Sequence, residues 1–226
     1  CTANDKLRVL NEAKAQAAMQ TEMTNARLKV QIAESHGDAE LFSREQLVSW
    51  FDGSHLNKSP AQWDPAKLLW VNAQYIKQAD NARLAELVAR QLLKQNDGLP
   101  VASGTEHLAQ LCALFKDRCD TTVALAAWAA KFYGEVLPDV AEKAQHVTEA
   151  VRPALTMLSE KLAVCVWDKG VIATVLKEVL AATGLKMPQL AMPVRLLVLG
   201  TTQTPSVDAV LELCGREKVL ARLANV

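Results

Sequence analysis

KMPQLAMPVRLLVLGTTQTPSVDAVLELCGREKVLARL, residues 186–223, combines a long apolar run with a single cationic side chain inside it, Arg195. A short helix is predicted over residues 206–214, where Gly215 ends it. Leu and Ala recur at three- and four-residue spacing here and almost throughout the chain, and no segment alternates with period two for long. The sequence therefore predicts an all-α fold.

Arg195 allows two interpretations on spacing alone. Its stem can lie along an apolar helix face with its head in water, which needs no function. Alternatively, its planar fork of donors suits a base edge or a phosphate. With Thr204 as N-cap and Pro205 as the first helical residue, the next helix would point free backbone N–H groups outward beside Arg195. This surface is a candidate place to hold an anion or a nucleotide base.

Arg118 occupies a similar position, between helices predicted over residues 105–117 and 121–133. Asp120 or Thr121 can cap the second of these helices. A cation at the end of a helix is also favoured by the helix dipole, without any ligand. The sequence alone leaves both interpretations of Arg118 open.

Capping signals predict most of the remaining helices. Asn96 to Gly104, rich in turn residues, is the best linker candidate. The predicted elements are a polar helical stretch 3–34, a helix capped by Ser43 and Gln46 through Phe51, a helix opened by Asp64-Pro65, a helix from Asp80 to about Lys94, a longer helix from Pro138-Asp139 interrupted or kinked at Pro153, and a helix 169–182 capped by Asp168.

The composition excludes several classes of function. The chain has 226 residues, of which 50% are hydrophobic, so it can bury a core and hold one or two domains. Lys plus Arg and Asp plus Glu number 25 each, so nucleic-acid binding would have to be local. Five cysteines without a CxxC pair favour a reducing, cytoplasmic setting, and no apolar run reaches the roughly 18 residues of a membrane span.

No motif indicates catalysis. The chain has no GxGxxG or GxxxxGK loop, no GxSxG elbow and no HExxH. Its four histidines are scattered without a close His or Cys partner, so no metal site is expected. We expect no catalytic residue in this chain.

Residues 37–226 closely resemble the C-terminal half of a bacterial glutamyl-tRNA synthetase, a glutamate–tRNA ligase. The order, spacing and length of the matching pieces all fit. These pieces are SHGDAELFSREQLVSWFD at 35–52, HLNKSPAQWDPAKLLWVN at 55–72, LFKDRCDTTVALA at 114–126, QHVTEAVRPAL at 145–155 and LKMPQLAMPVRLLVLGTTQTPSVDAVLELCGREKVLARL at 185–223.

The resemblance implies two consecutive helical domains along the inner side of a tRNA. Residues 37–98 would form a helical linking domain, residues 99–226 a helical anticodon-binding domain, and residues 1–36 stay unassigned. By its motif, Arg118 corresponds to the residue that reads the first anticodon base and Arg195 to the residue that reads the third. The loop that packs on the second and third bases corresponds to Thr204, Pro205, Ser206 and Val207.

Arg118 also resembles the arginine that distinguishes enzymes selective for the glutamate tRNA from relaxed ones. The HIGH-like and KMSKR-like motifs of the family's class I catalytic domain are absent from this sequence. ATP and Mg²⁺ are therefore expected only at that missing domain, with no cofactor in this chain. The implied partners are tRNA(Glu) and the catalytic domain of the same synthetase. The protein is expected to be a monomer and to make no contact with a membrane.

Two alternatives remain at this stage. The scaffold can serve as a stand-alone helical interaction module whose partner is no longer tRNA. Alternatively, the complete protein is an active ligase of which this chain is only a part.

Overall fold

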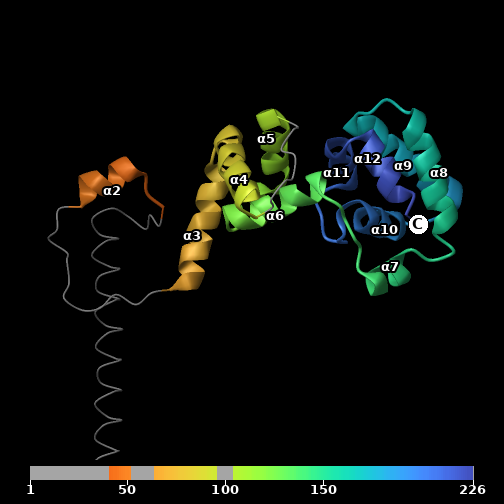
Figure 1. Ribbon diagram of the computed structural model, residues 1–226, viewed down its shortest axis with the longest axis horizontal. Coiled ribbons are helices and arrows are strands. Elements are labelled where there is room, and N and C mark those ends of the chain that lie inside the picture. Colours follow the sequence, from red (N-terminus) through yellow and green to blue (C-terminus); the bar gives the residue numbers. More distant parts are fainter. Residues whose placement is uncertain (1–40, 52–63, 96–103, 226) are drawn as a thin grey trace, which may run out of the picture. The chain divides into compact units, whose positions relative to one another are not determined.

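The computed structural model describes residues 41–51, 64–95 and 104–225, and every regular element in these ranges is a helix (Figure 1). The all-α prediction is therefore confirmed. The chain divides into two compact units, residues 1–63 and 64–226, each of which is treated by itself. No helix in the described ranges is long and apolar enough to cross a bilayer.

Some predictions fall on parts of the chain outside the described residues. The predicted helical stretch 3–34 lies outside them, and so does the predicted linker 96–104 apart from its last residue, Gly104. The proposed boundaries at 36/37 and 98/99 fall in the same segments. The division into a linking and an anticodon-binding domain stays a prediction.

Helix α2 spans Arg44–Trp50 in the first unit. The hydroxyl of Ser43 accepts from the Gln46 N–H at 3.1 Å, while Gln46 Oε1 accepts from the Ser43 N–H at 2.8 Å. This reciprocal capping box is the one that the sequence predicts. The rings of Phe42 and Trp50 pack edge to face, with their centroids 5.3 Å apart.

Helices α3 (Pro65–Gln78) and α4 (Asn81–Gln95) open the second unit. The carboxylate of Asp64 accepts two backbone N–H groups from the first turn of α3, and Asp80 does the same for α4. Each aspartate thus pairs donors that have no partner within the helix. Both predicted helix starts are confirmed.

Helix α5 (Gly104–Phe115), the 3₁₀ turn η1 (Lys116–Arg118) and α6 (Thr122–Tyr133) follow. Helices α4, α5 and α6 pack on one another, and η1 packs against α3. Inside this group the ring of Phe115 is stacked on Trp128 with centroids 4.8 Å apart. The predicted hinge between two helices at Arg118 is confirmed. The turn that follows α5, η1, is a 3₁₀ helix.

The prediction of one longer helix broken at Pro153 is wrong about the place of the break. Two helices form, α7 (Val140–His146) and α8 (Arg152–Val164), and the chain leaves helical geometry between them at 147–151. Pro153 lies in the first turn of α8, where a missing N–H costs no helical hydrogen bond. The proline therefore begins a helix instead of interrupting one.

The C-terminal helices are α9 (Lys169–Thr183), α10 (Met187–Leu199), α11 (Val207–Cys214) and α12 (Arg216–Leu223). Helix α10 packs against α7, α8, α11 and α12, which explains its long apolar run. Its buried residues are Leu190, Ala191, Pro193, Val194, Leu196, Leu197, Val198 and Leu199. Helix α11 also packs on α5, which joins the two helix groups of this unit.

Candidate nucleic-acid interface

Arg118 is the last residue of η1 and is exposed to solvent. Its neighbours fix the turn: Cys119 is buried, and Lys116 Nζ donates to the carbonyl of Ala79 at 3.2 Å. The guanidinium therefore extends from an anchored backbone position into water. This arrangement suits a side chain that meets a ligand from outside.

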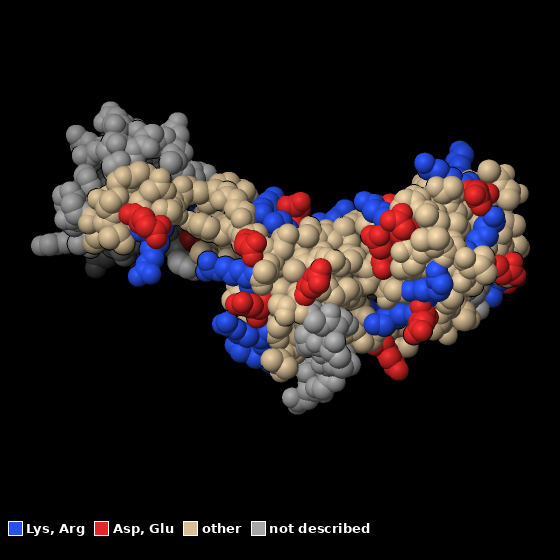
Figure 2. Space-filling view, turned by 90° about the horizontal axis from the view of Figure 1, so that it is seen from above, with Lys and Arg blue, Asp and Glu red and all other residues tan. Residues whose placement is uncertain are grey.

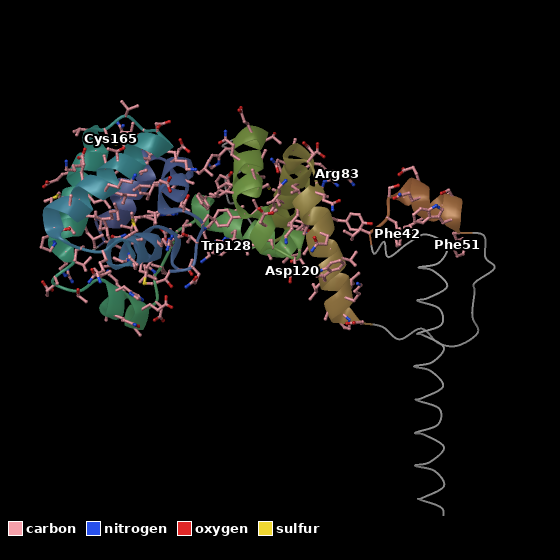
Figure 3. All side chains as sticks on the ribbon, turned by 180° about the vertical axis from the view of Figure 1, so that it is seen from behind. Phe42, Phe51, Arg83, Asp120, Trp128 and Cys165 are labelled. Carbon is pink, nitrogen blue, oxygen red and sulfur yellow. The ribbon has the colours of Figure 1, made fainter. Side chains whose placement is uncertain are left out.

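The other side of the turn is anchored by α3 and α6. Asn72 Nδ2 of α3 donates to the carbonyl of Asp120, which Figure 3 labels at the start of α6. Thr121 is the N-cap of α6, since its hydroxyl accepts from the Ala124 N–H at 3.1 Å. Thr121, and not Asp120, is thus the capping residue.

Arg195 lies half-buried on α10, between the buried Val194 and Leu196. Its Nη2 donates to the carbonyl of Pro205 at 3.3 Å, while its buried Nε has no hydrogen-bond partner among the described residues. Burial, and then the positive charge of Arg118, lower the pKa of Arg195. The two predicted arginines are therefore close enough for their charges to interact.

The predicted role of Thr204 as N-cap and of Pro205 as first helical residue is wrong. Helix α11 begins at Val207, with Ser206 as its N-cap residue. Thr204 lies two residues before this N-cap, where it is buried and its hydroxyl donates to the Pro205 carbonyl at 3.0 Å. Arg195 Nη2 and Thr204 Oγ1 thus meet at one carbonyl oxygen, which holds the loop against α10.

The start of α11 still leaves donors free. Ser206 is exposed and its side chain makes no capping hydrogen bond. The first N–H groups of α11 therefore lack a side-chain acceptor, and they carry the partial positive charge of the helix N-terminus. The helix thus begins one residue after the predicted start at 206 and two residues after Pro205, and its free end lies beside Arg195.

A cavity of about 240 Å³ lies between α9, α10 and the start of α11. This volume is below the range of about 300–1,000 Å³ that holds drug-sized ligands, so the cavity suits a smaller group such as a single base. Its lining combines apolar side chains with the charged Lys177, Arg195 and Asp208. The residues around it are Ala173, Leu176, Lys177, Met187, Ala191, Arg195, Ser206, Val207 and Asp208.

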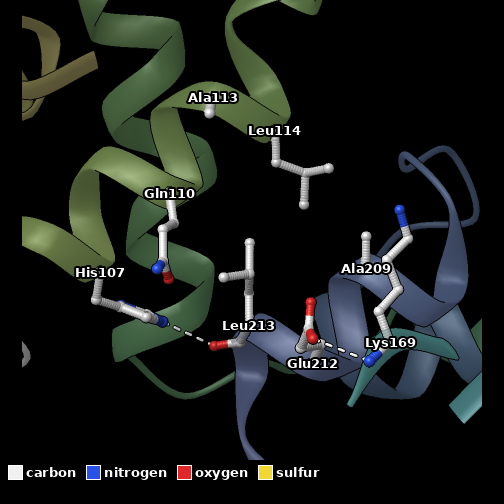
Figure 4. Close-up of a pocket in the computed structure, with 8 residues that line it drawn as sticks. All are labelled: His107, Gln110, Ala113, Leu114, Lys169, Ala209, Glu212 and Leu213. Atoms are coloured by element: carbon white, nitrogen blue, oxygen red, sulfur yellow. Dashed lines mark hydrogen bonds between the residues drawn. The ribbon is translucent and has the colours of Figure 1, made fainter. Parts of the chain in front are cut away.

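A larger cleft, of about 620 Å³, lies between α5, the start of α9 and α11 (Figure 4). On one side of it His107 Nε2 is 2.8 Å from the carbonyl of Leu213, and on the other the Lys169 N–H donates to Glu212. None of the six predicted site residues lines this cleft. We therefore define the candidate interface as the smaller cavity, where Arg195 lies, together with the turn that carries Arg118 and is anchored by Asn72.

The charges of the second unit do not form a broad basic face in the view of Figure 2, where Lys and Arg alternate with Asp and Glu. The whole chain likewise has a formal net charge of zero. A polyanion would therefore be recognised through local contacts at the arginines and not through a long-range field.

The family model of the anticodon binding domain matches residues 83–226. The chain belongs to the anticodon-binding domain family. This match includes η1, α6, α10 and the loop before α11, and so every residue of the candidate interface except Asn72.

Curated relatives and solved structures agree with this family. The chain is 62% identical over 190 residues to the glutamate–tRNA ligase of Paracidovorax citrulli, and 58% identical over 191 residues to that of Albidiferax ferrireducens. Each match covers 84% of this chain but only 39% and 40% of those proteins. The chain thus spans about two fifths of the length of these relatives.

The crystal structure of a glutamate tRNA ligase from Elizabethkingia meningosepticum matches with a TM-score of 0.73 at 20% identity. The match covers 84% of this chain and 37% of that chain. A second structure, of the synthetase from Elizabethkingia anophelis, matches with a TM-score of 0.68. At this identity the likeness shows a shared helical fold.

The anticodon-binding domain brings some predicted site residues together and separates others. Arg195, Ser206 and Val207 line one cavity, and Arg118 acts on Arg195 through its charge without lining that cavity. Thr204 is buried and does not line the cavity, and its hydroxyl donates to the carbonyl of Pro205. The hydrogen bond between Asn72 and the Asp120 carbonyl was not predicted from the sequence, because the two residues lie 48 positions apart and local patterns do not reach that far.

Proposed function

We propose that this chain binds the anticodon of tRNA(Glu) as part of a glutamate–tRNA ligase. The observation that supports it most is the state of Arg195, whose buried Nε has no partner at the edge of a base-sized cavity. Specific RNA recognition mostly targets unstacked bases of loops, through hydrogen bonds to their edges and packing on their faces. The partly buried guanidinium of Arg195 can donate hydrogen bonds to a base edge, and the apolar residues of the cavity can pack on a base face.

The proposed roles follow the family resemblance. Arg118 reads the first anticodon base from the exposed end of η1, and Arg195 reads the third from α10. The loop from Thr204 to Val207 packs on the second and third bases. In this proposal Arg118 also makes the enzyme selective for the glutamate tRNA.

The remaining ligase functions lie outside this chain in the same proposal. Amino-acid activation, with ATP and Mg²⁺, belongs to a catalytic domain that these residues do not include. The chain supplies recognition to that domain, in a monomeric cytoplasmic enzyme.

Arg195→Ala tests the proposal in a filter-binding series with tRNA(Glu) transcripts altered at each anticodon position. We expect a loss of about 1–3 kcal/mol in binding free energy and relaxed selectivity at one position only. Lys177→Ala, at the rim of the same cavity, is the matched control and should weaken all transcripts alike. Unchanged binding by Arg195→Ala would sink the assignment, and an equal loss on every transcript would reduce Arg195 to a phosphate contact.

A salt titration separates tRNA binding from a stand-alone interaction module. Because Lys and Arg displace counterions from phosphates, affinity for tRNA(Glu) should fall steeply as salt rises. Absence of any tRNA affinity at low salt would instead favour the module.

A further inference from the structure

Three cations that make no contact with the candidate interface gather where the C-terminal ends of α6 and α10 meet. We call Lys131, Lys218 and Arg222 the junction cluster. Arg222 and Thr204 are the only buried polar residues in the described part of the chain. The family resemblance assigns no role to any of the three.

Arg222 of α12 connects the two helix ends directly. Its Nη1 donates to the carbonyl of Val198 in α10 at 2.6 Å, and its Nη2 donates to the carbonyls of Lys131 and Gly134 at the end of α6, at 2.9 and 2.7 Å. The rigid fork of the guanidinium fixes the angle between these acceptors, which an ammonium group cannot do.

The two lysines repeat the pattern. Lys131 Nζ of α6 donates to the carbonyl of Leu199 at 3.1 Å, and Lys218 Nζ of α12 donates to the carbonyl of Phe132. No carboxylate forms a salt bridge with any of the three in the described ranges, where the ion pairs involve other residues. Their charge is therefore balanced by the carbonyls and dipoles of two helix C-termini.

The position of this junction matters because α6 and α10 each carry part of the candidate interface. Arg118 precedes α6, and Arg195 lies about one turn before the end of α10. Helix α6 has 12 residues and is thus about 18 Å long. A tilt of about 5° at its C-terminal end would move its beginning by roughly 1.5 Å, whereas a recognition site needs its groups within about 0.5 Å.

We propose that Arg222, supported by Lys131 and Lys218, is a positioning residue that sets the separation between Arg118 and Arg195, so that both reach bases of one RNA strand. The proposal rests on the proposed anticodon binding. Arg222 touches no base. It acts by holding the ends of α6 and α10 in one arrangement.

The test uses the whole chain with Arg222→Met, which keeps the apolar stem and removes the fork. The probe is the tRNA(Glu) transcript and the same transcript with a changed first anticodon base. We expect a lower melting temperature, and in the folded protein a ratio of the two affinities reduced by about 5-fold or more, the scale of one lost base contact. A merely structural residue would lower the melting temperature and leave that ratio at its wild-type value, which would overturn the proposal.

Arg216→Met is the matched control, because Arg216 also lies on α12 and donates to a backbone carbonyl, that of Cys165. It does not contact α6 or α10 through that bond, so the affinity ratio should stay at the wild-type value. If it falls as far as in Arg222→Met, the position of the junction cluster is irrelevant and the proposal fails. Where Arg222→Met does not fold, Lys131→Met removes one link between α6 and α10 and should shift the ratio in the same direction.

Arg118→Ala, measured on the transcript changed at the first anticodon base, and Arg195→Ala, measured on a transcript changed at the third, separate the two hypotheses. If neither changes selectivity, the proposed function itself fails. If they do while Arg222→Met and Lys131→Met keep the wild-type ratio, only the positioning role is wrong.

Discussion

Gly200→Ala probes the close packing at the end of α10. Gly200 is the C-cap residue of this helix and has φ +67°, in the left-handed region that side chains disfavour. A Cβ at this position would lie 2.9 Å from Val136 Cγ1, in the segment that follows α6. The missing side chain thus lets the chain after α6 approach the end of α10.

The structure separates two contributions to the expected loss. A left-handed conformation costs an alanine about 1–2 kcal/mol, and the smaller entropy of the unfolded chain returns about 0.4–1 kcal/mol. The contact with Val136 adds about 1–2 kcal/mol. This is the lower part of the range for overpacking costs, because the Val136 side chain is only half-buried and can shift. We therefore expect Gly200→Ala to lower the free energy of unfolding by about 2–3 kcal/mol.

Gly184→Ala is the matched control, measured beside it by urea denaturation. Gly184 caps α9 with φ +70°, and nothing lies within 4 Å of the position of its Cβ. Only the backbone contribution remains there, so the loss should be about 1 kcal/mol. Equal destabilisation by the two substitutions would refute the packing argument at α10.

Two further predictions concern the turn that carries Arg118 and the buried thiols behind it. Asn72→Ala removes the amide that donates to the Asp120 carbonyl. Because this carbonyl is exposed and can bond to water instead, the loss of stability should stay under about 1 kcal/mol. Binding to tRNA(Glu) should become less selective at the first anticodon base, because the turn that carries Arg118 loses an anchor. An unchanged first-base ratio in filter binding would mean that Asn72 does not orient the turn. Burial raises the pKa of Cys112 and of Cys119 from 9.0 to about 11, so both thiols favour the folded state up to about pH 9 and this stabilisation is lost as pH rises towards 11. Urea denaturation at pH 8 and 10.5 should show a smaller fall in stability for Cys119→Ala than for the wild type, and equal falls would contradict the shift.

Local signals predicted the helix starts well. Ser43, Asp64, Asp80 and Asp168 each cap the helix that the sequence assigns to them, because a cap needs only a side-chain oxygen and N–H groups two or three residues later. Local pattern left Asp120 and Thr121 as equal candidates for the cap of α6, and only the structure identifies Thr121. Thr204 resembles a cap in sequence, but the packing of the loop on α10 buries it and directs its hydroxyl elsewhere.

The candidate interface was only partly predictable. Arg118 and Arg195 were found because their surrounding motifs resemble a known family, while periodicity alone left each with an ordinary structural explanation. Asn72, Lys218 and Arg222 lie inside pieces that match the family, but the resemblance assigned them no role, and Lys131 lies outside those pieces. Their partners are backbone carbonyls distant in the sequence, and any residue type supplies a carbonyl, so no pattern of side chains marks them.

The sequence by itself determined that this chain is helical, where most helices begin, and to which family its motifs point, because caps, periodicity and short motifs depend on neighbours along the chain. The tertiary structure alone decided that the charges of Arg118 and Arg195, 77 positions apart (195 − 118), act on one another. That proximity depends on how α6 and α10 pack. Packing in turn depends on carbonyls and apolar surfaces that meet only once the helices have come together.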